Sequence, residues 1–88
     1  MPLRTLEANG AEVSVSDSGA GDPIVLLHGL LGGHRTWQRQ VDAFALTHRV
    51  LALSPRYYHP NRWPDDGAGF GVPRHAADVA ALARELRL

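Results

Sequence analysis

An apolar run that stops at a glycine-rich loop constrains the fold more than any other stretch of this sequence. Residues 24–27 read IVLL, His28-Gly29 follows directly, and two more glycines stand at positions 32 and 33. A half-exposed strand alternates apolar with polar residues, whereas a strand of a parallel sheet is covered on both faces and is apolar throughout. The run therefore predicts a parallel strand, buried on both faces, that ends in a tight turn.

A helix and a second strand are predicted after this loop, which gives a strand–helix–strand unit over residues 24–54. Thr36 is a candidate helix N-cap. Four apolar residues follow at helical spacing, namely Trp37, Val41, Phe44 and Ala45. Residues 49–53, RVLAL, form the second apolar run. Two strands joined by a helix over so few residues indicate a parallel pair with a right-handed crossover. Trp37 is interpreted as helix-to-sheet packing in preference to a substrate contact.

A β-hairpin over residues 1–17 is predicted to precede this unit. Asn9-Gly10 separates two short segments, and this dipeptide is the strongest short-range hairpin signal. In the second segment two apolar residues alternate with three polar ones, in the order Glu12, Val13, Ser14, Val15 and Ser16. We therefore expect the second strand to have one face in water.

A long loop over residues 55–72 and a helix over residues 73–88 complete the chain. The loop is rich in proline, glycine and aromatic residues, and loops of this length are usually functional or mobile. Pro73 suits the first turn of a helix. Five residues predict its buried face: Ala76, Val79, Ala80, Ala83 and Leu86. Arg74 and Asp78, four residues apart, are expected to pair on the wet side. No glycine caps the end of this helix.

Charge and composition exclude several classes of function. Nine arginines balance nine acidic residues, so no charge asymmetry favours nucleic acid or an anionic membrane surface. The absence of cysteine excludes disulfides and thiolate metal sites. The five histidines lack metal-ligand spacing, so we expect no metal and no cofactor. No apolar run is long enough to span a membrane, and no signal peptide is recognisable, so a cytoplasmic location is expected.

The segment IVLLHGLLGGHRTWQRQVDAFALTHRVLALSPRYYHPN resembles the N-terminal part of α/β-hydrolase-fold enzymes. In that family a buried strand ends in His-Gly, a helix with an early tryptophan follows, and the next strand leads into a loop with an arginine. Here these residues are His28-Gly29, Trp37 and Arg56. The resemblance implies an α/β fold class: a β-hairpin, a parallel βαβ unit and a C-terminal helix on an incomplete sheet, with residues 1–88 forming the N-terminal fragment of one domain.

The same resemblance implies a site in the glycine loop. When a nucleophile attacks an ester carbonyl, negative charge develops on the oxygen, and preorganised N–H donors stabilise it. By resemblance one donor is the backbone N–H of Leu30, with Gly29 allowing a sharp turn and His28 bracing the loop through side-chain hydrogen bonds. A plain turn and a phosphate loop are the alternatives, and the phosphate-loop motifs are absent. Arg56 is interpreted as a loop anchor rather than a substrate ligand.

Aromatic residues of the long loop are candidates for contact with a small-molecule substrate, because loops at the carboxyl ends of parallel strands often line a crevice. The candidates are Tyr57, Tyr58 and Trp63, with His59 and Phe70 nearby in the sequence. An ordered lid that packs on itself is an equal alternative for this group. Leu31 stands where epoxide-hydrolase-like members tend to carry proline, which counts against that branch of the family.

No Gly-x-Ser-x-Gly motif occurs, so the nucleophile, acid and catalytic histidine of the family are expected beyond Leu88. The parent is predicted to be a serine hydrolase acting on esters or related small molecules, although aspartate and cysteine nucleophiles stay open. The fragment alone is predicted to be inactive. The alternatives are a non-catalytic half-fold binding or regulatory module and a truncated gene product. Left bare, the apolar edge of the strand that ends at His28 invites aggregation, self-association or strand addition by a partner.

Overall fold

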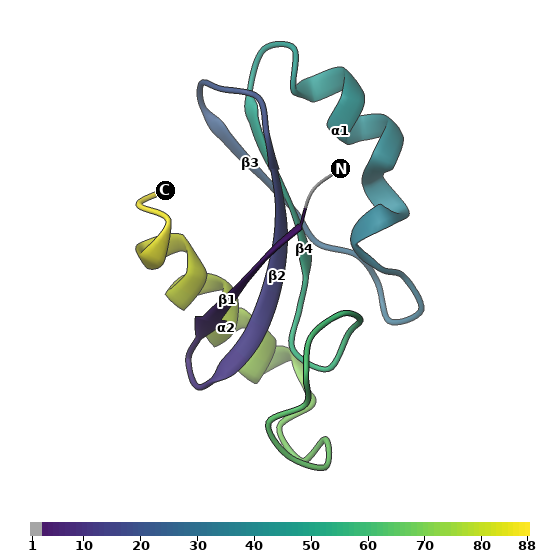
Figure 1. The fold of residues 1–88 in the computed structure, drawn as a ribbon, viewed down its shortest axis with the longest axis vertical. Coiled ribbons are helices and arrows are strands. Elements are labelled where there is room, and N and C mark those ends of the chain that lie inside the picture. The colour runs from purple at the N-terminus through teal and green to yellow at the C-terminus, as the bar shows by residue number, and fades with distance from the viewer. Residues whose placement is uncertain (1–2) are drawn as a thin grey trace.

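A four-stranded mixed sheet forms the centre of the molecule (Figure 1). The computed structural model describes residues 3–88, so Met1 and Pro2 of the predicted hairpin lie outside the described residues. The strands are β1 (Leu3–Ala8), β2 (Ala11–Ser18), β3 (Pro23–Leu26) and β4 (Arg49–Ser54), in the spatial order β1-β2-β4-β3. β2 runs antiparallel to β1 and β4, whereas β3 and β4 are parallel, as the strand–helix–strand pattern predicts.

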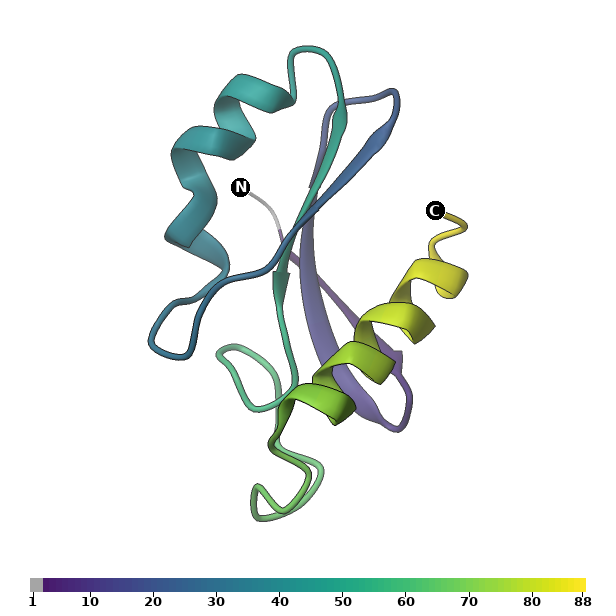
Figure 2. The same cartoon turned by 180° about the vertical axis from the view of Figure 1, so that it is seen from behind.

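The helices cover opposite faces of this sheet (Figure 2). A 3₁₀ turn, η1 (His34–Trp37), leads into α1 (Gln38–Phe44) on one face, and α2 (Val72–Glu85) lies on the other. Thr36 is not the N-cap of the helix. It lies inside η1, where its hydroxyl accepts a hydrogen bond from the Gly33 N–H at 3.0 Å. The 3₁₀ turn thus begins three residues before the position that the N-cap signal predicts.

The β1–β2 hairpin turns where the Asn9-Gly10 signal predicts it. Asn9 has φ 54° and Gly10 has φ 81°, so both central residues adopt the left-handed conformation of a type I′ turn. Ala8 pairs with Ala11 on either side of the turn.

The polar face of β2 is buried, and the prediction that it lies in water is wrong. Ser14 and Ser16 have no exposed surface. The loop after β4 folds back over this face, where the Ser14 hydroxyl donates to the Asn61 side-chain oxygen at 2.5 Å. The buried Ser14 hydroxyl is satisfied by this partner, as buried polar groups usually are, whereas the Ser16 hydroxyl has no hydrogen-bond partner among the described residues.

β3 departs from prediction in the opposite sense, because its apolar side chains are not fully covered. Val25 is 37% exposed, and Leu27, just after the strand, is 49% exposed. Within residues 3–88 β3 has a hydrogen-bonded neighbour on one side only, β4. A parallel strand is fully buried when other strands and helices surround it. β3 is an edge strand in this structure, so its apolar side chains stay partly exposed.

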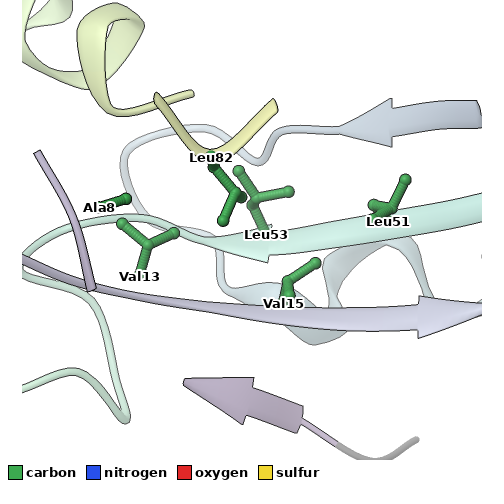
Figure 3. Packing of buried hydrophobic residues seen from close by; sticks show 6 residues of the cluster. All are labelled: Ala8, Val13, Val15, Leu51, Leu53 and Leu82. Carbon is green, nitrogen blue, oxygen red and sulfur yellow. The ribbon is translucent and has the colours of Figure 1, made fainter. Parts of the chain in front are cut away.

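Two clusters of side chains form the core, one on each face of the sheet. Under α2, Leu82 packs with residues of the three other core elements, as Figure 3 shows: Ala8, Val13, Val15, Leu51 and Leu53. Under α1, the buried cluster is Val41, Val50 and Ala52, with Trp37 packed against it. Trp37 therefore packs between helix and sheet, as interpreted from the sequence. Each such fully buried aliphatic side chain contributes about 1.5–3 kcal/mol relative to exposure.

α2 buries a carboxylate where the sequence predicts a wet surface. Asp78 is 2% exposed and pairs with Arg56, which is 3% exposed, rather than with Arg74. Arg56 donates to both Asp78 oxygens at 2.8 and 2.9 Å and to the Asn9 carbonyl at 2.9 Å. The Asn9 side-chain amide completes the network by donating to Asp78 at 3.0 Å. Arg56 is thus the loop anchor that the sequence favours, and it joins the hairpin, the loop and α2.

Because this carboxylate faces the sheet, the buried face of α2 is rotated from the predicted stripe. Leu82 is buried and Val79 and Leu86 pack against the core, whereas Ala76 and Ala80 are exposed. The helix also ends earlier than residue 88. Arg87 adopts φ 57°, and the N–H groups of Arg87 and Leu88 bond back to the carbonyls of Arg84 and Ala83. This is a Schellman ending with arginine in the position that glycine usually takes.

Within residues 3–88, neither helix has the length and apolar character needed to cross a membrane.

Candidate functional site

A hollow of about 260 Å³ lies at the carboxyl end of the parallel pair β3 and β4. Three segments enclose it: the turn after β3, the loop after β4, and the beginning of α2. Its lining includes His28, Leu30, Tyr58, Phe70 and His75. The topology places loops of different strands at one edge of the sheet, where binding sites of parallel sheets usually form.

Leu30 occupies the centre of the turn after β3. The Gly32 N–H donates to the Gly29 carbonyl at 3.0 Å, which closes a β-turn with Leu30 and Leu31 at its central positions. The Leu30 side chain is 68% exposed. Its N–H lies outside every helix and strand and donates no hydrogen bond to any other described residue. The amide therefore has no acceptor within residues 3–88.

His28 holds this turn from within. Its Nδ1 lies 2.6 Å from the Gly29 carbonyl oxygen. The imidazole ring meets the Tyr58 ring edge-on, with the ring centroids 4.6 Å apart. The His28 Nε2 atom is covered and has no hydrogen-bond partner among the described residues. These contacts are those that a bracing role requires.

The glycine that this turn needs is Gly32 rather than Gly29. A Cβ at Gly32 would lie 2.8 Å from the Thr36 hydroxyl and 2.9 Å from the His28 Cβ, closer than real Cβ atoms approach. A Cβ at Gly29 would meet nothing within 4 Å. The structure thus gives no steric reason for glycine at position 29.

Tyr58 fastens the turn from the opposite side of the hollow. Its hydroxyl donates to the Leu30 carbonyl at 2.8 Å, a bond between residues 28 positions apart. Phe70 and His75 stand behind it, with ring centroids 6.3 and 6.4 Å from the tyrosine ring. Of the three aromatic candidates, Tyr58 is the one that the structure brings together with Leu30 and His28.

Tyr57 and Trp63 pack against each other within the loop, with ring centroids 5.1 Å apart, as the lid alternative predicts. Phe70 connects this cluster to the hollow, because its ring centroid lies 6.1 Å from that of Tyr57. Tyr57 is 8% exposed, and its hydroxyl donates to Asp65 at 2.7 Å and accepts from the Gly69 N–H at 3.0 Å. The Trp63 indole N–H donates to the Tyr57 carbonyl at 3.0 Å. The Tyr57 hydroxyl, followed by the Gly67 N–H, lowers the pKa of Asp65 below its usual value. Neither aromatic ring lines the hollow.

His75 was not singled out from the sequence, yet it lines the hollow from the first turns of α2. Its ring meets Phe70 edge-on, with centroids 5.1 Å apart. Pro73 marks the start of this helix, and a residue two positions later lies in the first turn beside the preceding loop. The position of His75, two residues after Pro73, is the sequence signal that could have identified it as a residue next to the loop.

The residues that line the hollow are mostly apolar or aromatic, and their polar groups are the imidazoles of His28 and His75, the Tyr58 hydroxyl and the backbone of the turn. No carboxylate, cysteine or serine lines it. Within residues 3–88 no group of three or more histidine or carboxylate side chains is suited to hold a metal ion. The described residues can therefore donate to an oxygen that gains negative charge, but they bring no nucleophile to it.

Comparisons with known proteins agree with this fold. No protein-family model matches the chain. An epoxide hydrolase of Caballeronia sordidicola is 27% identical over 84 residues, covering 94% of this chain and 26% of that protein. The crystal structure of an epoxide hydrolase of Vigna radiata superposes with a TM-score of 0.90 at 26% identity, covering 99% of this chain and 29% of the other. A metagenomic epoxide hydrolase of the α/β-hydrolase superfamily from a hot environment gives 0.91 at 28% identity, covering 99% and 30%.

The protein thus has a partial α/β fold of the kind found in hydrolases. More particularly, the comparisons confirm the predicted resemblance: the chain has the fold of the N-terminal portion of the α/β-hydrolase superfamily. It spans 26–30% of the length of the relatives described here. These relatives are epoxide hydrolases, the branch of the family against which Leu31 counts in the sequence. One residue in an exposed turn is a weaker guide than similarity over nearly the whole chain.

Proposed function

We propose that residues 1–88 supply the oxyanion-binding turn of a hydrolase with the α/β-hydrolase fold. The observation that carries this is the Leu30 N–H, which has no acceptor within residues 3–88 while its turn is fixed on both sides. Gly32 and His28 bond to the Gly29 carbonyl, and Tyr58 bonds to the Leu30 carbonyl. A donor held in place before reaction costs no reorganisation when charge develops.

The reaction class is hydrolysis of an ester or a related small molecule. Attack on an ester carbonyl places negative charge on its oxygen, and one preorganised donor to that oxygen is worth about 10²–10³ in kcat. The similarity to epoxide hydrolases supports epoxides as the related substrates. Ring opening also leaves negative charge on an oxygen, so the same N–H serves either substrate.

The 88 residues alone are proposed to be inactive. Acyl transfer needs a nucleophile with an adjacent base, and the hollow contains neither a serine nor a carboxylate. Those groups, whether serine-, aspartate- or cysteine-based, come from chain outside these residues. Incubation of the 88-residue chain with p-nitrophenyl acetate and with styrene oxide should give no saturable turnover above a denatured control. Saturable turnover would refute the incomplete site.

The donor itself is tested in a chimera in which residues 1–88 replace the aligned part of the Vigna radiata epoxide hydrolase. Leu30→Pro removes the N–H at a turn position that accepts proline, and Leu30→Ala is the matched control that keeps it. We expect kcat to fall by about 10²–10³ in the proline variant and by less than about tenfold in the alanine variant. Circular dichroism checks that both variants are folded. Equal kcat values would remove Leu30 from the site.

A second candidate function is a binding module, favoured by the exposed edge of β3. Val25 and Leu27 remain partly exposed, and no charged residue interrupts positions 23–27 of this edge. Bare apolar edges pair with further strands, including those of a second copy. Light scattering after size exclusion tests this: a defined dimer that Val25→Lys dissociates supports the module, and a monomer at all concentrations counts against it.

A further inference from the structure

The Gly29 carbonyl oxygen accepts two hydrogen bonds. The Gly32 N–H reaches it at 3.0 Å and closes the β-turn. The His28 Nδ1 reaches it at 2.6 Å. This carbonyl and the Leu30 N–H belong to one peptide unit, the Gly29–Leu30 amide. Whatever changes the charge distribution of the carbonyl therefore also acts on the N–H that the proposed function uses.

The contact fixes which nitrogen of His28 carries a proton. A carbonyl oxygen only accepts, so Nδ1 is the protonated nitrogen that faces it. In the neutral ring Nε2 then bears a lone pair, and Nε2 has no partner among the described residues. The ring is also held in place, by the edge-on Tyr58 ring at 4.6 Å and by the backbone at Gly32, where an added Cβ would come within 3.2 Å of the His28 Cγ.

Donation to an amide oxygen draws electron density from nitrogen to oxygen. The peptide bond has partial double-bond character through resonance, and an acceptor bond at oxygen strengthens the charge-separated form. Linked hydrogen bonds polarise one another in this way, by about 10–30% per bond in condensed phases. The N–H of the same unit becomes a stronger donor.

We propose that His28 is a positioning residue that strengthens the Leu30 N–H by polarising the Gly29–Leu30 peptide. For its use in hydrolysis the inference rests on the proposed function, but the polarisation can be measured without activity. The structure supplies an internal control. The Tyr58 hydroxyl bonds to the Leu30 carbonyl, which belongs to the next peptide unit, so Tyr58 acts on the Leu31 N–H instead.

The test uses the ¹⁵N-labelled 88-residue chain and reads the amide ¹⁵N and ¹H chemical shifts of Leu30 and Leu31. His28→Phe keeps an aromatic ring beside Tyr58 and removes the donor, so both nuclei of the Leu30 amide should move upfield while those of Leu31 hold. His28→Asn returns a side-chain N–H near the position of Nδ1 and should bring the Leu30 shifts back. Tyr58→Phe should move Leu31 and leave Leu30.

Three results would overturn the inference. The Leu30 shifts could stay unchanged in His28→Phe, Leu30 and Leu31 could move together as in a general loosening of the turn, or His28→Asn could fail to restore them. Amide shifts of β4 report whether each variant is folded, and the Tyr58 variant tests the same reasoning independently of any substitution at His28. Failure here would leave the Leu30→Pro test of the donor untouched, so the two proposals fail separately.

Discussion

Replacement of Asp78 by alanine is expected to be the most damaging single change outside the apolar core. The carboxylate accepts two hydrogen bonds from Arg56 and one from Asn9. Its removal leaves the Arg56 guanidinium, 3% exposed, without its counter-charge. Breaking a buried pair by removing one partner costs about 3–5 kcal/mol, because the remaining charge stays desolvated.

That loss is large beside the whole stability of the domain. A chain of this length has an unfolding free energy of about 4–13 kcal/mol, at 0.05–0.15 kcal/mol per residue. With a urea m value of about 1–2 kcal/mol/M, the midpoint of unfolding should fall by about 1.5–5 M. A domain at the low end of the stability range would then be unfolded without denaturant. Urea titration followed by circular dichroism measures the shift.

Two further variants separate the buried pair from the surface pair that the sequence predicted. Arg74→Ala should change the unfolding free energy by less than about 0.5 kcal/mol, because Arg74 is exposed and bonds to no carboxylate among the described residues. The double variant Arg56→Met with Asp78→Leu should regain most of the stability, because both charges leave together. If Arg74→Ala were as damaging as Asp78→Ala, the assignment of the pair would be wrong.

Three smaller effects follow from other contacts. Hydrogen bonds and charge from Arg49 lower the pKa of Asp17 below its unfolded value near 4. The stability that Asp17 contributes is therefore present above about pH 4 and is lost as the pH falls through the lowered pKa. Urea midpoints measured between about pH 5 and pH 2 should decline less in Asp17→Asn than in the parent. Arg87→Gly should raise the unfolding free energy by up to about 1 kcal/mol, since φ 57° costs arginine more than glycine; no gain in melting temperature would argue against the Schellman ending. Gly32→Ala should lower the melting temperature through contact with Thr36 and His28, whereas Gly29→Ala should not, and the reverse order would contradict the turn geometry.

Local patterns predicted most of the fold, because their causes are local. The Asn9-Gly10 turn needs only two residues that tolerate positive φ. The parallel β3–β4 pair follows from two apolar runs and the helix between them. Burial was harder to predict, since it depends on residues far away in sequence. Ser14 is covered by Asn61, 47 positions later, and Asp78 by Arg56, 22 positions earlier.

In the candidate site too, the sequence predicts local features but not contacts between distant residues. Resemblance located the turn around Leu30, but no pattern within the loop distinguished Tyr58 from its neighbour. Tyr57 adopts φ 76°, and this backbone conformation helps turn the adjacent tyrosines into different clusters, one at the hollow and one in the self-packed loop. A positive φ at a tyrosine is uncommon, so no sequence rule would have predicted it.

The opposite placement of the two helices determines where the sheet can grow. α1 carries the chain from β3 to β4 across one face, and α2 leaves β4 along the other face (Figure 2). Crossovers between parallel strands are right-handed, so a connection over the face that α2 covers leads from β4 back past β3. The other side of β4 is already occupied by β2. A parallel strand entering from α2 has room only outside β3. With such a strand in place, the end of β3 would be the point where the winding of the sheet changes direction. In open α/β sheets ligand crevices usually form at such a point, and the turn that contains Leu30 follows β3 directly.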